Sequence, residues 1–349
     1  MKYRVLDWLA CPACRWPDLA LKVIKATSEE TWAGAWEDGE HQLPGLDHGG
    51  RSLVDILEGE LGCPQCNATY PISDGVPRML PSGDPGGPGT GHRWTRFHGE
   101  APEYEENFRD MTAPLRPEDF LGKLVLDAGC GFGRHAFYAA RYGAEVVALD
   151  SSSDAIASSR ENCKRLPRVH VIQGDIHRPP LRSEVFDMVL CMGVLHHLPE
   201  PHQGFQALHH LLRAGGRLAV WVYGPRQGTI KVVSGALHGA AASLEDEQLH
   251  SFSQALASGI RLFSHTPYVA LKGVPVLSSV VTHLPVHDHH KWPFDVLVAD
   301  IYDRLRVPVT AYITGEELER WFADDGYADI KVTRRVRNNE SFRGIGFRR

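Results

Sequence analysis

Short apolar runs alternate with helical patterns over residues 124–223 of the chain. Five of these runs have the length and composition of buried strands, at residues 124–126, 146–149, 169–172, 185–190 and 218–222. Continuous apolar strands between helices are typical of a parallel sheet that is covered on both faces. The pattern therefore predicts an α/β core.

The alternation returns after residue 310. Thr314 and Glu317 have the spacing of a capping box, which begins a short helix that Gly326 ends. Residues 330–332 and 341–347 then follow strand patterns. Two closing strands after five parallel ones predict a Rossmann-like sheet of seven strands.

Residues 225–310 interrupt this alternation, and we expect them to form a mainly helical insertion. One amphipathic helix stands out there, with a candidate cap at residues 243–246. Five apolar side chains are expected to share its buried face: Leu249, Phe252, Leu256, Ile260 and Phe263.

Composition and charge limit the classes of function. The chain has 349 residues, 43% of them hydrophobic, and a formal net charge of −6. Such a chain has no general electrostatic attraction to nucleic acid. It contains no apolar run of about 20 residues, and a charge near its start argues against a signal peptide. The scattered cysteines argue against a secreted disulfide framework, so we expect a cytoplasmic protein.

The first predicted strand runs directly into a turn at residues 127–133, which contains Gly129, Gly131 and Gly133, and then into a helix. Glycines in such a turn let a ligand approach the backbone closely. The spacing differs from that of dinucleotide folds, and the turn lacks the Lys-Ser/Thr pair of a phosphate loop. Asp150 ends the next strand, where it can accept hydrogen bonds from both hydroxyls of a ribose. The alternative is an ordinary tight turn and a helix-capping aspartate.

Residues 125–135, Val-Leu-Asp-Ala-Gly-Cys-Gly-Phe-Gly-Arg-His, resemble motif I of the class I methyltransferases that use S-adenosylmethionine (SAM), in particular methyltransferase type 11. Residues 173–176, 186–198 and 212–218 resemble later motifs of that family, in the family's order. The likeness is dense over residues 121–224 and looser near the C-terminus.

The resemblance implies SAM as the cofactor. It implies that glycines of the turn shape the methionine pocket and that Asp127 meets the amino group directly or through water. It also implies that Asp150 binds the ribose and Asp175 the adenine edge. The residues expected to bind the cofactor are Asp127, Gly129, Cys130, Gly131, Gly133, Asp150, Ser151, Asp175, Ile176 and Met192.

His196 and His197 are the candidate catalytic bases, because they follow the segment that borders the methyl group in the resembled family. An imidazole, with an ordinary pKa of about 6.5, suits the removal of a proton from the acceptor. The alternative is that both histidines bond to backbone groups, and that the enzyme works by proximity alone.

Two cysteine pairs share the form Cys-Pro-x-Cys: Cys11 with Cys14, and Cys63 with Cys66. Four thiolates from two such turns make the closed tetrahedral site that is typical of structural zinc. A redox Cys-x-x-Cys motif is the rival interpretation, but it explains one pair rather than two alike. The pattern predicts a structural zinc ion on these four cysteines.

Residues 6–14 and 61–81, which surround the pairs, resemble the Trm112-like family of small zinc-ribbon proteins. Members of that family activate separate methyltransferases by docking on them. Here the resemblance implies such a module fused in cis, with a structural or interface role. An insertion at residues 15–60, which contains Trp32 and Trp36, departs from the short form of the family.

The candidate contacts to the acceptor lie near the insertion and before the first strand. Residues 282–292 are rich in histidine, which predicts either a transition-metal cluster or a loop whose imidazoles cap helices. Residues 92–108 form an aromatic segment that either closes over the cofactor or packs on the sheet. The candidate substrate residues are Trp94, His287, His289 and His290.

A basic group near the C-terminus is either a site for an anionic acceptor or an ordinary exposed strand surface. It consists of Arg334, Arg335, Arg337, Arg343, Arg348 and Arg349.

The predicted organisation is a zinc-ribbon domain at 1–82, a linker at 83–91, a SAM-binding core at 92–224, a helical substrate cap at 225–310, and the last helix and closing strands at 311–349. The predicted function is methyl transfer to a small-molecule acceptor, without membrane partners. One alternative is an RNA methyltransferase that docks its substrate through the zinc ribbon. Another is a SAM-binding scaffold without enzymatic activity.

Overall fold

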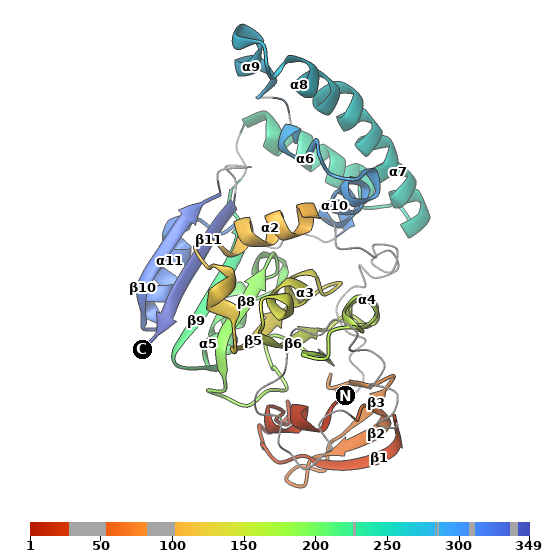
Figure 1. Cartoon of the computed structure of the whole chain (residues 1–349), viewed down its shortest axis with the longest axis vertical. Helices are drawn as coiled ribbons and strands as arrows, with labels where there is room; N and C mark the ends of the chain where they lie inside the picture. The colour runs from red at the N-terminus through yellow and green to blue at the C-terminus, as the bar shows by residue number, and fades with distance from the viewer. Residues whose placement is uncertain are drawn as a thin grey trace.

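The computed structural model describes residues 1–27, 54–81, 102–225, 228–282, 284, 286–306, 311–335 and 341–349. Three parts follow one another along the long axis: a small N-terminal domain, an α/β core and a helical cap (Figure 1). Trp32, Trp36, Trp94, His283 and the predicted linker at 83–91 lie outside the described residues.

A sheet of seven strands forms the core, in the order β10-β11-β9-β8-β5-β6-β7. The parallel strands are β5 (Leu124–Ala128), β6 (Glu145–Asp150), β7 (Val169–Gln173), β8 (Phe186–Met192) and β9 (Leu212–Tyr223). The closing strands are β10 (Tyr327–Arg334) and β11 (Ser341–Arg348), and β11 pairs antiparallel with β9 and β10. The predicted fold class is confirmed.

Helices cover both faces of this sheet. Leu126 lies in an apolar cluster with side chains of α5 and α11, whereas Val125 lies in a second cluster with side chains of α2, α3 and α4. Neighbouring residues of one strand thus point to opposite, equally buried faces. The helices are α2 (Pro102–Thr112), α3 (Arg134–Arg141), α4 (Ser153–Cys163), α5 (Pro201–His209) and α11 (Gly315–Asp324).

Local signals set the ends of α11 where the sequence placed them. The Thr314 hydroxyl accepts a hydrogen bond from the backbone N–H of Glu317 at 3.1 Å, which satisfies one of the helix's unpaired donors. Gly326 follows the helix with a φ of 76°, a left-handed conformation that glycine adopts readily.

The N-terminal domain holds a short helix, η1 (Tyr3–Asp7), and a four-stranded antiparallel sheet. The strands are β1 (Ala20–Ala26), β2 (Ile56–Gly62), β3 (Thr69–Ser73) and β4 (Val76–Pro77). The predicted insertion at residues 15–60 therefore contributes β1 and much of β2 to this sheet.

This domain packs directly on the α/β core. The Met79 N–H donates to the carbonyl oxygen of Gln173 at 2.9 Å, at the end of β7. The Arg182 guanidinium of the core donates to the Leu9 and Pro17 carbonyls at 3.1 and 2.8 Å. One apolar cluster contains residues of both parts. Unfolding of the N-terminal domain is therefore expected to destabilise the core.

The cap is helical, as the sequence predicts. Its elements are α6 (Gly228–Ala241), α7 (Asp246–Ile260), η5 (Arg261–His265), α8 (Thr266–Leu271), α9 (Pro275–Val281), η6 (His287–His289) and α10 (Phe294–Arg306). The long helix α10 packs against α7 between the core and the outer end of the cap (Figure 1).

The prediction for Phe263 was wrong. Leu249 is buried on α7 as expected, but 74% of Phe263 is exposed. The chain continues from α7 into η5, which is a π-helix. The wider turn changes the angular position of each following residue, so Phe263 leaves the buried face.

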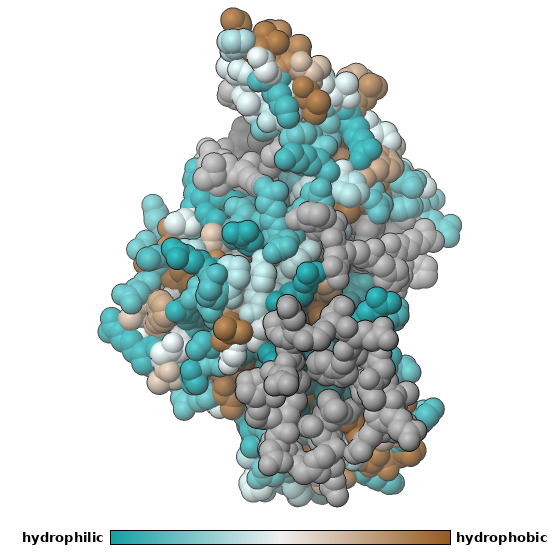
Figure 2. All heavy atoms as spheres, viewed as in Figure 1, coloured by the Kyte–Doolittle hydropathy of each residue, from teal (hydrophilic) through white to brown (hydrophobic). Residues whose placement is uncertain are grey.

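The outer end of the cap exposes apolar side chains (Figure 2). Besides Phe263, they include Leu262, Val276 and Val280. In the part of the chain that the structure describes, no helix combines the length and apolar character needed to cross a membrane.

Candidate functional site

The glycine turn after β5 is fixed by the neighbouring strand β6. The N–H groups of Gly129 and Cys130 both donate to the Leu149 carbonyl, at 2.8 and 2.9 Å. Gly129 has a φ of 75°, and a Cβ there would lie 2.4 Å from a methyl group of Val194. A Cβ at Gly131 would meet nothing within 4 Å. One glycine thus permits tight packing, and the other leaves open space in front of the backbone.

Asp127 lies buried behind this turn with half of its carboxylate engaged. Oδ2 accepts a hydrogen bond from the Ala136 N–H at 2.9 Å, whereas Oδ1 has no hydrogen-bond partner among the described residues. Nδ1 of His135 lies 4.0 Å from Oδ1, beyond hydrogen-bond distance. Burial raises the pKa of Asp127 to about 7 and lowers the pKa of His135 well below its ordinary value. The unpartnered oxygen fits a cationic group of a ligand, such as an ammonium.

Asp150 holds the turn from the end of β6. Its Oδ2 accepts from the Gly131 N–H and its Oδ1 from the Ser152 N–H, both at 2.9 Å. Burial raises its pKa against these hydrogen bonds. Because a carboxylate has about four lone-pair positions and backbone N–H groups of Gly131, Ser151 and Ser152 occupy part of them, Asp150 can still accept from a ribose hydroxyl.

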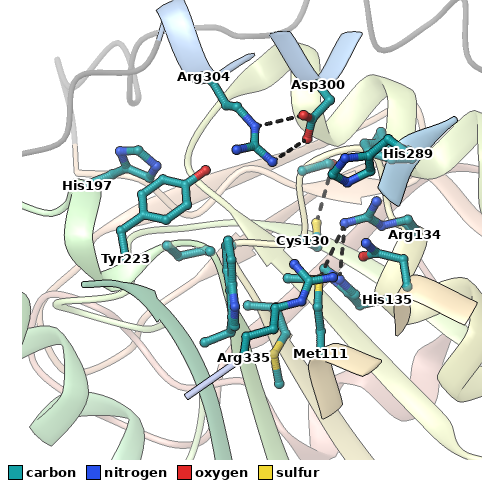
Figure 3. A pocket seen from close by; sticks show the side chains of 18 of the residues that line it. Met111, Cys130, Arg134, His135, His197, Tyr223, His289, Asp300, Arg304 and Arg335 are labelled. Carbon is teal, nitrogen blue, oxygen red and sulfur yellow. Dashed lines mark hydrogen bonds and ion pairs between the residues drawn. The ribbon is translucent and has the colours of Figure 1, made fainter. Parts of the chain in front are cut away.

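A cavity of about 230 Å³ opens in front of the turn (Figure 3). The predicted site residues that line it are Gly129, Cys130, Gly131, Met192, His197 and His289. The predicted residues that lie outside its lining are Asp127, Gly133, Asp150, Ser151, Asp175, Ile176, His196, His287 and His290. Asp150 therefore supports the backbone of the turn and Asp127 the start of α3, and the cavity extends from the turn toward the cap.

The two adjacent histidines differ in position. His196 is fully buried, and its Nδ1 accepts a hydrogen bond from the Tyr223 N–H at 3.2 Å. His197 lines the cavity next to Tyr223. Of the two candidate bases, only His197 has its imidazole where a ligand in the cavity can reach it.

The histidines of the cap also separate. Nδ1 of His287 lies 2.8 Å from the Leu284 carbonyl, and Nδ1 of His290 lies 3.0 Å from the His287 carbonyl, so both nitrogens donate to backbone oxygens. His289 is buried in the cavity wall with its ring centre 4.0 Å from that of Trp292. Within the described residues, these histidines form no group able to hold a metal ion.

Most of the remaining wall comes from residues that the sequence did not single out. They are Asn107 and Met111 of α2, Arg134 of α3, Trp221 and Tyr223 of β9, Trp292 before α10, and Asp300 and Arg304 of α10. Arg335, which also lines the cavity, belongs to the predicted C-terminal basic group.

The four cysteines of the N-terminal domain meet at one point. Their sulfur atoms all lie within 4.8 Å of one another, and Cys11 Sγ is 3.6 Å from Cys66 Sγ. Four sulfurs around one zinc ion at about 2.3 Å are separated by about 3.8 Å, so the arrangement fits a tetrahedral site. Cys11 is buried, yet hydrogen bonds from Tyr70 and two backbone N–H groups lower its pKa to about 7, whereas desolvation and the neighbouring thiols raise the pKa values of Cys14 and Cys66. The support for a metal site is therefore the arrangement of the four sulfur atoms.

A side chain of the N-terminal domain reaches the turn after β6. Nη1 of Arg78 donates to Gln173 Oε1 at 3.2 Å. The amide nitrogen of the same Gln173 donates to the Ser151 carbonyl at 2.9 Å and to the Ser153 hydroxyl at 3.0 Å. The N-terminal domain is therefore connected through one glutamine to the residues that follow Asp150.

Comparisons with known proteins match two parts of the chain. Residues 126–220 match the family model described as a methyltransferase domain, and residues 2–75 match the model described as Trm112p-like protein. Among solved structures, magnesium protoporphyrin IX methyltransferase from Synechocystis PCC 6803 is similar with a TM-score of 0.41 and 16% identity, covering 74% of this chain and 93% of that one.

Several curated proteins are similar over part of their length. An uncharacterized protein of Synechococcus sp. is 28% identical over 72% of this chain and 56% of its own length. The ubiquinone biosynthesis O-methyltransferase of Pectobacterium atrosepticum is 34% identical over 30% of this chain and 44% of that protein. The tRNA U34 carboxymethyltransferase of Idiomarina loihiensis is 36% identical over 34% of this chain and 38% of that protein. The chain thus spans about half, or less, of the length of these relatives.

Proposed function

Since the chain joins a methyltransferase domain to a Trm112p-like domain, we propose that it transfers a methyl group from SAM to a small-molecule acceptor. The position of the cavity between the glycine turn and the cap supports this proposal. The glycine turn forms one wall, α2 contributes Asn107 and Met111, and α10 of the cap contributes Asp300 and Arg304. A cavity enclosed by three separate elements suits a small acceptor better than a nucleic acid strand.

Each residue of the site has a proposed task. SAM supplies a methyl carbon on a positively charged sulfur, and the acceptor bonds to this carbon as the carbon–sulfur bond breaks with its electrons on sulfur. Asp127 holds the amino group with its unpartnered Oδ1, and Asp150 accepts from the ribose hydroxyls. Met192 borders the reacting carbon. The chain's main contribution is alignment of the acceptor with that carbon.

His197 is the proposed base for an acceptor that must lose a proton. Its ring lines the cavity, and its neighbour Tyr223 lies on the same wall. His196 is proposed to position this wall, because its Nδ1 accepts the Tyr223 N–H and its carbonyl accepts the Ala311 N–H.

The proposed function is tested with methyl-labelled SAM. Wild-type protein is expected to transfer label to the small-molecule fraction of a cell extract and not to its RNA. Asp150→Ala is expected to weaken SAM binding by 100-fold or more, roughly the loss of two hydrogen bonds to a charged group, as measured by calorimetry. Its matched control is Asp154→Ala, which removes an exposed carboxylate from the same segment.

Three outcomes would contradict parts of this proposal. Label in RNA, with binding that weakens steeply as salt rises, would favour the RNA methyltransferase. SAM binding without any transfer would favour the non-enzymatic scaffold. Undiminished SAM affinity in Asp150→Ala would refute the assigned cofactor site.

The contact between the two domains gives a second, smaller prediction. Arg78→Met should weaken SAM binding about 3- to 10-fold, because Gln173 loses a partner and the Ser151 turn loosens. The measurement is calorimetry at constant zinc content. Lys25→Met is the control, since Lys25 lies in the same domain, is largely exposed and pairs with Glu58 on the neighbouring strand. Equal affinities for the two variants would rule out this connection.

A further inference from the structure

Arg335 is buried in the cavity wall with part of its guanidinium unused. Only 4% of the residue is exposed. Nε donates to Asp110 Oδ2 at 2.5 Å, but Nη2 has no hydrogen-bond partner among the described residues. Oδ1 of Asn107, which lines the same cavity, is also buried and has no partner in the part of the chain that the structure describes. Buried polar atoms of this kind are costly, so their presence in a cavity wall indicates a polar ligand.

Among the described residues, the charged groups that contact Arg335 leave one positive charge uncompensated. Asp110 also pairs with Arg343, whose Nη1 lies 3.4 Å from Oδ1 and donates to the Asp110 carbonyl at 2.7 Å. One carboxylate thus serves two guanidinium groups. The single acidic side chain in the described lining, Asp300, is paired with Arg304 at 2.7 Å. The site therefore has a place for one more anionic group beside Arg335.

The sheet order places Arg335 on the side away from the predicted ribose site. Arg335 follows β10, and its N–H donates to the Ser341 carbonyl at the start of β11. β11 and β9 lie on one side of β8, whereas β5 and β6, which carry Asp127 and Asp150, lie on the other. Met192, which is proposed to border the reacting carbon, ends β8 between them.

The wall near Arg335 is aromatic. Its guanidinium carbon lies 5.8 Å from the centre of the Trp221 ring, and Tyr223 and Trp292 line the same cavity. Figure 3 shows Arg134, Arg304 and Arg335 directed toward one central space from three different elements. Aromatic walls with guanidinium groups at their edge suit a flat apolar body that carries an acidic group.

We infer that the methyl acceptor is a small carboxylic acid with a planar body, and that Arg335 binds its carboxylate. The inference rests on the proposed function and names the class of its substrate. The carboxylate accepts from Nη2 and neutralises the excess positive charge of the cluster of Asp110, Arg335 and Arg343. The cofactor also has a carboxylate, and the experiment separates the two sources.

The experiment uses the full chain saturated with S-adenosylhomocysteine and titrates it with benzoate or with the uncharged benzamide. Benzoate is expected to bind at least about tenfold more tightly than benzamide, because only benzoate forms a hydrogen bond between two charged groups with Arg335. Arg335→Gln should remove this preference and leave the affinity for S-adenosylhomocysteine unchanged. Arg335→Lys should keep part of the preference for benzoate. Arg334→Gln is the matched control, because Arg334 is the exposed neighbour that lies over Phe342.

Two results overturn the inference. Equal binding of benzoate and benzamide to the wild-type complex would show that the cavity has no carboxylate site beside the cofactor. A tenfold or larger loss of affinity for S-adenosylhomocysteine in Arg335→Gln, with unaltered benzoate binding, would assign Arg335 to the cofactor's own carboxylate. If the wild-type protein binds no S-adenosylhomocysteine, the proposed function itself fails, which is a different observation.

Discussion

Cys14→Ser should lose zinc and destabilise the N-terminal domain by several kcal/mol, although Cys14 is exposed. Exposed substitutions without a specific role usually change the free energy of unfolding by less than about 0.5 kcal/mol. A structural zinc site, by contrast, contributes on the order of 10 kcal/mol to folding. Because packing cannot explain a large effect at an exposed thiol, this variant separates a metal site from four cysteines that only lie close together.

The measurement combines zinc content per chain with unfolding in urea. Cys66→Ser, the other exposed cysteine of the group, should behave like Cys14→Ser. Cys163→Ala is the control, because Cys163 is a buried thiol of α4 outside the group. Full stability in Cys14→Ser, together with metal-free wild-type protein, would contradict the zinc assignment. Since one apolar cluster joins the domain to the core, chelation should also lower the core's stability.

The parts of the fold that the sequence predicts are those set by local rules. Apolar runs bounded by polar residues identify the strands of the core, and Thr314 and Gly326 identify the ends of α11. Phe263 shows where such rules stop. A helical periodicity assumes a constant angle per residue, and the π-helical turn of η5 changes that angle without any clear signal in composition.

Some residues of the site can likewise be predicted from the sequence, and others cannot. The turn after β5 and Asp150 are recognisable because their residues are close in sequence and take part in hydrogen bonds with backbone groups of the turn. Arg335 and Arg304 reach the cavity only after the sheet closes and the cap folds back over it. His196 and His197 are neighbours in the short helix η4 (Leu195–His197), yet only one faces the cavity. Which of two adjacent side chains faces a ligand depends on backbone angles that the sequence pattern does not determine.

Asp127→Asn should stabilise the protein in the absence of SAM at neutral and alkaline pH. The pKa of Asp127 is raised from 3.8 to about 7 by burial. The folded state therefore binds this proton more tightly than the unfolded state. Stability from the group is fully present below the unfolded pKa and is lost as the pH rises to about 7. This rise in the pKa corresponds to a loss of about 4 kcal/mol in the free energy of unfolding, which the neutral amide avoids.

The experiment measures the free energy of unfolding of both proteins at about pH 5 and about pH 8. The stabilisation by Asp127→Asn should be larger at the higher pH. Asp154→Asn, which alters an exposed carboxylate, should show no such gain at either pH. Equal pH dependence of wild type and Asp127→Asn would mean that Asp127 is ionised in the folded protein without cost.

The same carboxylate should make SAM binding pH-dependent. In the proposed site the ammonium of SAM pairs with the ionised form, so a group with a pKa of about 7 is expected to lower the affinity about 30-fold near pH 5.5 and about twofold near pH 7. Between these values wild-type affinity should rise at least tenfold, while Asp127→Asn should bind weakly at both. We therefore expect Asp127 to destabilise the folded chain before the cofactor binds, and the cofactor's positive charge to remove that cost. An Asp127→Asn variant that is more stable but binds SAM as tightly as wild type would leave the buried, unpartnered oxygen without a function.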